Sequence, residues 1–528
     1  MRARLLEERA RDTDDVLDRR FDAWPRLLAT FRAIHDGVQH ESVRLPGHGG
    51  GLFDPGRYPF LEAAAGRISN AVVLRILDDL QTLVVPVPGG TERRPLSFKA
   101  LGVEQIGHVY ERLLEHWAMR ADAPALGLAG KKEPEIALAE LQEIATRGEM
   151  ELIDWLVDHT GRTRNAVMKA RALRPTGMDV ERLLAACDND DELLDRVMPF
   201  AGLVRTDHDG EPCVYLPGRI YVTERPGGRA FQSHYTPRSL TEPTVEYALE
   251  PVVYEGPAEG VDRADWRLRT PTELLNLKIC DIACGSGAFL VAACRQLATL
   301  LVESWAQCPN DRPPLLPSDP EEQQLIAQRF VAERCLYGVD KNPLAIEIAK
   351  VSLWLTTLRR GQPFTFVDHA LRCGDSLIGI TDIAQLEFLS MDREGTMLPN
   401  DVREGVKASV AGACELRETI ASTDAMDLAQ VEAKESLLAE FERVTAGLRA
   451  VADLVVFAQL ASCGKKGTRP GELLTPYLDD VRKTLRDTAL PLASLVAGAA
   501  NLRATSDAGK VDPNLHPLHW TLEFPEVF

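Results

Sequence analysis

The stretch LKICDIACGSGAFL, from Leu277 to Leu290, decides the fold. Its first half, residues 277–283, is a short apolar run of the kind that forms a buried parallel strand, and an apolar helix is expected to begin at Ala288. Between them lies the turn Cys-Gly-Ser-Gly, residues 284–287. Glycines allow positive φ and let a ligand lie against bare backbone, while the first turn of a helix offers unpaired N–H groups. The stretch therefore predicts a binding loop between a strand and a helix.

Two kinds of cofactor loop begin in this way. The dinucleotide fingerprint requires a small residue three positions after its second glycine, where this chain has Leu290. With Asp281 on the strand and Cys-Gly-Ser-Gly-Ala-Phe after it, the segment instead resembles motif I of S-adenosylmethionine-dependent amino-methyltransferases, the adenine-N6 and cytosine-N4 DNA enzymes. An ordinary glycine-rich turn is the alternative interpretation. The resemblance implies cofactor contacts from Asp281, Ala283, Cys284, Gly285, Gly287 and Phe289.

A second apolar strand is expected at CLYGVD, residues 335–340, with Asn342 as a helix cap and Pro343 in the first helical position. A carboxylate at the end of this strand accepts hydrogen bonds from both ribose hydroxyls, so Asp340 is the expected ribose ligand. It follows Gly287 by 53 residues, against ~20 in a compact dinucleotide unit. A Pro- and Asp-rich loop near residues 308–320 accounts for the excess. Lys341 stands where related enzymes place an apolar residue under the adenine ring.

The third expected strand runs through FTFVDHALRCGDSL, residues 364–377. In this resemblance Asp375 accepts a hydrogen bond from the exocyclic amine of the cofactor's adenine, and Leu377 lies against the ring. The Gly-Asp-Ser turn alone carries no information. Its position as the third element in the right order supports the interpretation.

Upstream of the loop, QSHYTPRSLT (residues 232–241) resembles the element that precedes motif I in these enzymes. There the threonine hydroxyl and nearby backbone hold the methionine carboxylate, which implies the same role for Tyr235, Thr236 and Pro237. A proline turn that caps a helix over residues 240–249 is the alternative.

The catalytic tetrapeptide of amino-methyltransferases, Asp/Asn/Ser-Pro-Pro-aromatic, is absent from this sequence. The Pro313-Pro314 pair is flanked by Arg312 and Leu315, and Asn342-Pro343 is followed by Leu344. No catalytic residue is therefore expected in this chain. The segment HWTLEFPEVF, residues 519–528, resembles a segment that lies shortly before this tetrapeptide in one family of large methylases.

That family is the large single-chain adenine-N6 methylases of Type IIG restriction–modification and of phage-exclusion systems of the BREX and DISARM kinds. GLFDPGRYPFLE (residues 51–62) and LGVEQIGHVYERLL (residues 101–114) resemble its pre-catalytic region. The resemblance implies an α/β fold: a Rossmann-like S-adenosylmethionine-dependent methyltransferase sheet, incomplete because its catalytic half is missing, with a helical N-terminal region and a helical insertion. Without a fourth strand, residues 277–283 would form an open sheet edge.

The implied function is the cofactor-binding portion of a site-specific DNA adenine-N6 methyltransferase in restriction–modification or phage defence. Its partners would be DNA, through the complete enzyme, and a complementary polypeptide that carries the catalytic motif and a target-recognition domain. A non-catalytic cofactor-binding or regulatory subunit, a fragment of a disrupted gene, and an RNA or protein methyltransferase remain alternatives.

Composition agrees with a cytoplasmic protein. The net charge of −19 has the wrong sign for a surface that binds phosphates, so DNA binding by this chain alone is expected to be weak. The charged N-terminus excludes a signal peptide, and no uninterrupted apolar run approaches the ~18 residues of a membrane span. The ten cysteines contain no Cys-x-x-Cys pair, so we expect buried thiols and no metal.

Three parts are expected along the chain. Residues 1–228 read as mainly helical, including 101–117 and 151–173, and end in a hairpin at 212–224. Residues 229–382 form the cofactor half-domain. Residues 383–528 form a helical insertion that leads toward the absent catalytic motif, with a heptad helix through residues 437–455. A separate helical domain without a functional role is the alternative for this last part.

Overall fold

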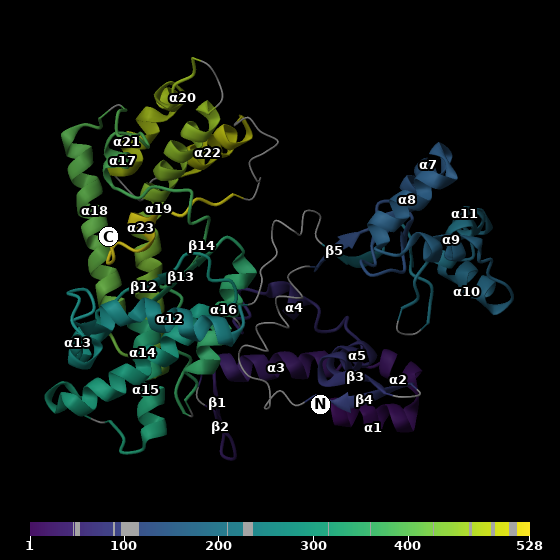
Figure 1. Cartoon of the computed structure of the whole chain (residues 1–528), viewed down its shortest axis with the longest axis horizontal. Coiled ribbons are helices and arrows are strands. Elements are labelled where there is room, and N and C mark those ends of the chain that lie inside the picture. The colour runs from purple at the N-terminus through teal and green to yellow at the C-terminus, as the bar shows by residue number, and fades with distance from the viewer. Residues whose placement is uncertain are drawn as a thin grey trace. The chain divides into compact units, whose positions relative to one another are not determined.

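The computed structural model describes residues 1–45, 47, 53–87, 90–96, 116–207, 210–224, 236–314, 316–359, 361–395, 397–425, 427–463, 467–486, 492–505 and 515–528. The chain divides into two compact units (Figure 1). One unit comprises residues 109–234, and the other comprises residues 1–108 together with 235–528. The expected cofactor residues fall in the second unit, except that Tyr235 lies outside the described residues.

The centre of the larger unit is a three-stranded parallel sheet of β12 (Ile279–Asp281), β13 (Leu336–Asp340) and β14 (Leu371–Cys373). The spatial order is β12-β13-β14, with Asp281 opposite Gly338 and Asp340 opposite Cys373. Among the described strands, β12 pairs on one side only and lies at an edge. Three strands therefore form where the sequence predicts them, although β14 is much shorter than residues 364–377.

Helices cover one face of this sheet. They are α14 (Ala288–Gln307), α15 (Pro320–Arg334) and α16 (Pro343–Thr356), and they share one hydrophobic core with Leu336 and Leu371. The predicted proline-rich connection is confirmed, because η5 (Pro309–Asp311) and loops separate α14 from α15. Before the sheet come α12 (Arg238–Val253), β10 (Tyr254–Glu255), η4 (Arg263–Asp265), β11 (Arg267–Leu268) and α13 (Pro271–Leu275).

The opposite face is covered by the last residues of the chain. Tyr337 and Val339 of β13 pack against Leu518 and Phe524, beside the short helix α23 (Trp520–Glu523). The backbone of residues 516–520 runs beside residues 375–380, because Asp375 N donates to the carbonyl of His516 at 2.8 Å and Leu518 N donates to that of Ile378 at 2.7 Å. The segment is thus an integral layer of the fold.

A helical region stacks behind this segment (Figure 1). It contains α17 (Ala384–Glu387), α18 (Asn400–Ser422), α19 (Leu428–Ser462), α20 (Pro470–Leu474), η6 (Thr475–Tyr477), α21 (Leu478–Arg486) and α22 (Ala493–Thr505). The predicted heptad positions lie in α19, and α18 packs along it. By length and composition α14 and α19 are apolar enough to cross a membrane, but 56% and 67% of their apolar windows are buried inside the protein, as in core helices of soluble proteins.

The N-terminal residues of the same unit are mainly helical. They form α1 (Arg2–Asp12), α2 (Asp14–Asp18), α3 (Ala23–His35), β1 (Val38–Gln39), β2 (Arg44–Leu45), α4 (Pro59–Ala63), α5 (Asn70–Gln81), β3 (Thr82–Val87) and β4 (Gly90–Pro95). A small core around Leu5, Leu17 and Leu28 holds these helices together.

The unit of residues 109–234 is also mixed. Its helices are α7 (Leu138–Arg147), α8 (Glu149–Thr160), α9 (Arg164–Ala172), α10 (Met178–Ala186), α11 (Asp191–Val197) and η2 (Met198–Leu203); its strands are β5 (His116–Arg120), β6 (Ala125–Gly127), β7 (Glu135–Ala137), β8 (Val214–Tyr215) and β9 (Ile220–Glu224). Two sequence predictions are wrong here. Trp117 belongs to a strand, and the expected hairpin does not form, because β8 pairs with β6 while β9 pairs with β5.

Candidate cofactor site

The candidate site lies where β12 and β13 end. Parallel strands bring their carboxyl ends to one edge of a sheet, so Asp281 and Asp340 come to the same edge as the Cys-Gly-Ser-Gly turn. Gly285 and Gly287 have φ of 52° and 85°, the left-handed conformations that the sequence predicts for them. The N–H of Gly285 donates to Oδ2 of Asp340 at 3.0 Å. The loop and the second strand are therefore joined directly.

The other oxygen of Asp340 is also engaged. Oδ1 accepts from the N–H of Asn342 at 2.8 Å, and the side chain of Asn342 accepts from the N–H of Leu344 at 3.1 Å. The predicted Asn cap and the Pro343 start of α16 are thus confirmed. Asp340 fixes both the glycine loop and the entry to α16.

Close packing explains why this loop differs from the dinucleotide fingerprint. A Cβ on Gly287 would lie 3.2 Å from Cα and Cβ of Ala349, so α16 packs directly on the loop. A Cβ on Gly338 would lie 2.8 Å from Cδ1 of Leu290. In the dinucleotide fingerprint, a small residue on the helix lets the helix pack closely on the neighbouring strand. Here Gly338 on β13 lets α14 pack closely in the same way. Sequence analysis missed Gly338, although a glycine inside an apolar strand indicates such an approach.

Asp281 carries an unsatisfied acceptor. Its Oδ1 accepts from the N–H of Ala283 at 3.1 Å, whereas Oδ2 is buried without a partner among the described residues. Burial raises the pKa of Asp281 above its ordinary value; the Ala283 N–H opposes this shift, and the nearby charge of Asp340 adds to it. A hydrogen-bond donor or cation beside Oδ2 would therefore be strongly favoured.

The remaining expected residues are spread around the strand ends. Asp375 accepts from the N–H of Leu377 at 3.0 Å, and the side chain of Leu377 is 85% exposed. Lys341 is exposed. Phe289 is half-buried and packs against the core of the larger unit. Thr236 and Pro237 directly precede α12, which packs on α14.

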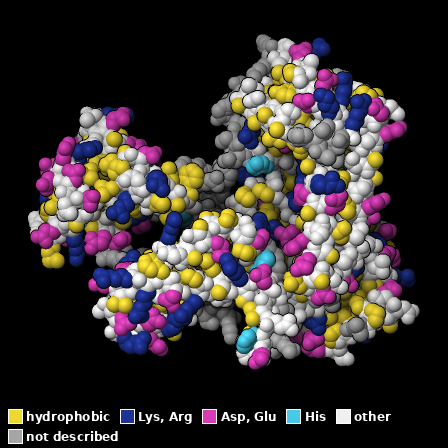
Figure 2. Space-filling view, turned by 180° about the vertical axis from the view of Figure 1, so that it is seen from behind, with side chains coloured by type: hydrophobic (Ala, Val, Ile, Leu, Met, Phe, Trp, Pro, Cys, Tyr) yellow, Lys and Arg dark blue, Asp and Glu magenta, His cyan; other side chains and the backbone are white. Residues whose placement is uncertain are grey.

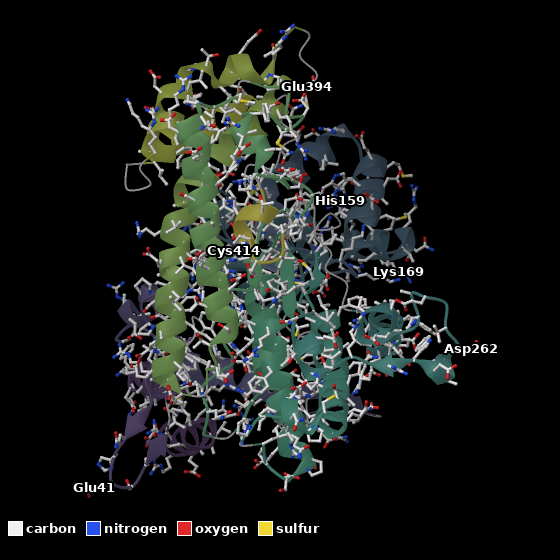
Figure 3. All side chains as sticks on the ribbon, turned by 90° about the vertical axis from the view of Figure 1, so that its left-hand side faces the viewer. Glu41, His159, Lys169, Asp262, Glu394 and Cys414 are labelled. Carbon is white, nitrogen blue, oxygen red and sulfur yellow. The ribbon has the colours of Figure 1, made fainter. Side chains whose placement is uncertain are left out.

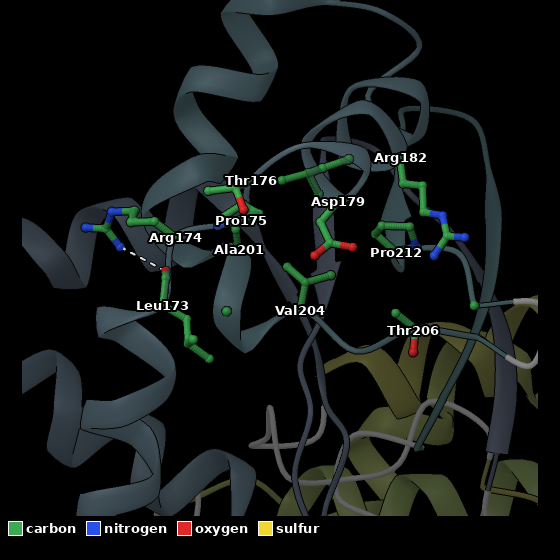
Figure 4. A pocket seen from close by; sticks show the side chains of 13 residues that line it. Leu173, Arg174, Pro175, Thr176, Asp179, Arg182, Ala201, Val204, Thr206 and Pro212 are labelled. Atoms are coloured by element: carbon green, nitrogen blue, oxygen red, sulfur yellow. Dashed lines mark hydrogen bonds between the residues drawn. The ribbon is translucent and has the colours of Figure 1, made fainter.

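Two other cavities lie elsewhere. One of about 300 Å³ lies in the unit of residues 109–234, and in Figure 4 the carboxylate of Asp179 points into it between Val204 and Pro212. The other, of about 320 Å³, is lined by Lys278, Arg334 and Glu526 among others, near the amino end of β12. Neither cavity is lined by any of the expected cofactor residues.

The described cysteines form no disulfide, but the prediction that all are buried is wrong. Cys280, Cys373 and Cys463 are exposed, and Cys414, marked on α18 in Figure 3, is half-buried beside the carbonyl of Pro525. Cys280 lies in β12, which pairs on one side only among the described strands. On the face seen in Figure 2, basic and acidic side chains are interspersed.

Comparisons with known proteins bear on this geometry. Residues 262–385 match the family model of the MmeI DNA-methyltransferase domain. The predicted family resemblance is confirmed. The MmeI-like region contains β12, β13, β14 and all the expected site residues except Tyr235, Thr236 and Pro237, which lie upstream of it. The resemblance shown is to Type IIG-like adenine methyltransferases.

Two relatives agree with the MmeI-like assignment. A putative type II restriction enzyme and methyltransferase of Methanocaldococcus jannaschii is 24% identical over 361 residues, which cover 58% of this chain and 27% of that protein. The type II restriction enzyme and methyltransferase Eco57I of Escherichia coli is 29% identical over 90 residues, 17% of this chain and 9% of that protein. The chain thus spans about a quarter or less of the length of these relatives. No solved structure matches the chain.

Proposed function

We propose that this chain provides the S-adenosylmethionine-binding part of a site-specific DNA adenine-N6 methyltransferase in a restriction–modification system. The observation that carries the proposal is the meeting of Asp281, the glycine loop and Asp340 at the ends of two adjacent parallel strands. The MmeI-like match over the same residues supports it. In this proposal the three strands are half of a Rossmann-like sheet, and the protein acts in the cytoplasm.

The residues present fit this cofactor. The buried, unpartnered Oδ2 of Asp281 suits the ammonium group of the methionine moiety, and the exposed Leu377 offers apolar surface to an adenine ring. Asp340 would accept from the ribose hydroxyls and Asp375 from the adenine amine. Ala283, Cys284, Gly285, Gly287, Phe289 and Lys341 would complete the site beside Tyr235, Thr236 and Pro237.

The bound cofactor would supply an electrophilic methyl group for in-line displacement by the exocyclic amine of a flipped adenine. The chain's own residues would hold the cofactor, and the Asn/Asp-Pro-Pro-aromatic motif that positions the amine would come from another polypeptide segment. The unpaired edge of β12 supports this division, because a parallel strand added there would extend the sheet. A chain that methylates DNA alone would contradict it. Membership of a BREX or DISARM system stays a prediction.

Isothermal titration of the purified chain with S-adenosylmethionine tests the cofactor assignment. We expect saturable binding that D340N weakens at least about tenfold, since a hydrogen bond to a charged group is worth roughly 1.5–3 kcal/mol. The matched control is D190N. Asp190 also accepts a backbone N–H, at the start of α11, but lies in the other unit, and Asn caps helices as well as Asp does. Absence of wild-type binding, or equal binding by D340N, would refute the assignment.

A further inference from the structure

A chain of alternating charges connects the N-terminal segment to two elements of the candidate site. Nη2 of Arg57 donates to Oε1 of Glu347 at 3.2 Å, and Nζ of Lys350 donates to the same oxygen at 3.1 Å. Nζ of Lys350 also donates to Oδ1 of Asp368 at 2.9 Å. Two cations and two carboxylates therefore balance one another.

The network adjoins the carboxyl end of β13, which carries Asp340, and the amino end of β14. Glu347 lies in α16, four residues after Pro343, so about one helical turn separates it from the Asp340 end of β13. Asp368 lies three residues before β14, whose far end leads to Asp375. Lys350 is only 8% exposed, so the interior part of the network is shielded from solvent.

The segment that carries Arg57 is also held by α3. Phe53 packs on Phe31 with ring centroids 5.4 Å apart, and Nε1 of Trp24 donates to the carbonyl of Leu61 at 3.1 Å. Arg57, which is 44% exposed, joins this segment to the charge network through its ion pair with Glu347. Without it, Glu347 and Asp368 would share the positive charge of Lys350, and Oε2 of Glu347 is already buried without a partner in the part of the chain that the structure describes.

We propose that Arg57 is a positioning residue for the cofactor site: it fixes residues 53–63 onto α16 and completes the charge balance that holds the ends of β13 and β14 in place. The proposal rests on the proposed function, since it takes S-adenosylmethionine as the ligand. It assigns the N-terminal helices a part in cofactor binding, which sequence analysis gave only to residues from 235 onward. Arg57 acts through Glu347 and need not touch the cofactor.

The test is titration of S-adenosylmethionine into R57Q, R57K and R93Q, with a melting curve for each. R57Q is expected to bind roughly fivefold more weakly, the equivalent of about 1 kcal/mol for a partly exposed ion pair. R57K is expected to restore binding, because Arg57 makes a single contact rather than a bidentate one. R93Q is the matched control: Arg93 makes a single contact, at 3.0 Å, to Asp78, a carboxylate that Arg2 also contacts, and the pair has comparable exposure and lies outside residues 53–63.

The outcomes separate the two proposals. If the wild-type chain binds and R57Q matches it, or if R93Q weakens binding equally, the role of Arg57 is refuted while the cofactor assignment stands. If the wild-type chain does not bind, the proposed function fails, and the role of Arg57 fails with it. A drop in R57Q melting temperature with no rescue of binding by R57K would show a purely structural role and would also refute the proposal.

Discussion

Arg417 and Glu526 form an ion pair from which solvent is excluded. Nη2 and Oε1 are 2.6 Å apart, and the two side chains are 0% and 3% exposed. Arg417 also donates to the carbonyl of His369, and the hydroxyl of Tyr337 donates to Glu526 at 3.1 Å. The pair thus connects α18, the central strand β13 and the segment that ends the chain.

Removing one partner of this pair is expected to destabilise the larger unit strongly. E526Q leaves the guanidinium of Arg417 buried without a counter-charge, which typically costs about 3–5 kcal/mol. Urea unfolding followed by circular dichroism measures the loss. The control is E440Q, which removes the exposed pair between Glu440 and Arg443 and should leave the midpoint unchanged. Equal midpoints for E526Q and the wild type would show that the pair does not hold the terminal segment.

The buried carboxyl of Asp281 makes the folded chain less stable when it is charged. Because the pKa of Asp281 is raised in the folded chain, mainly by burial, its charged form is less favourable there than in the unfolded chain. The stability that the protonated form of Asp281 contributes is fully present at pH values below its ordinary pKa. This contribution is lost as the pH rises through the raised pKa. D281N should remove this dependence.

The expected result is opposite effects on stability and on binding. From pH 4 upward, D281N should become progressively more stable than the wild type, because the raised pKa of Asp281 makes its charged form unfavourable in the folded chain, while its affinity for S-adenosylmethionine falls. Unfolding curves at several pH values, together with titration at pH 7, measure both. Parallel stability curves for the two proteins would contradict the burial argument.

Local sequence patterns predicted the strand ends well. Gly285, Gly287 and Asn342 could be placed because positive φ and helix capping depend on a few neighbouring residues. The sequence did not reveal the contacts between distant segments. Arg57 belongs to the stretch GLFDPGRYPFLE, but no local pattern predicts its pairing with Glu347, which lies 290 positions later. The strands after residue 212 were expected to pair with each other, but their partners β5 and β6 come 88 to 108 residues earlier.

Gly287 of the loop differs from Gly260, another left-handed glycine of the same unit, in the space around a Cβ. G287A should cost about 1 kcal/mol for the left-handed conformation, and more because its Cβ would lie 3.2 Å from Ala349. G260A is the matched control, since Gly260 has φ of +72° but open space around a Cβ. The difference between the two variants in unfolding free energy therefore measures the packing of α16 on the loop. No difference would show that this packing is loose.

Substitution of Leu377 separates an effect on cofactor binding from an effect on folding stability. Its side chain is 85% exposed, so L377A should leave the unfolding midpoint unchanged. If the adenine ring lies against it, truncation removes apolar contact worth roughly 1–2 kcal/mol and weakens S-adenosylmethionine binding about five- to thirtyfold. L80A is the control, because Leu80 is 51% exposed on α5. A midpoint shift in L377A, or equal affinity in both variants, would place the adenine elsewhere.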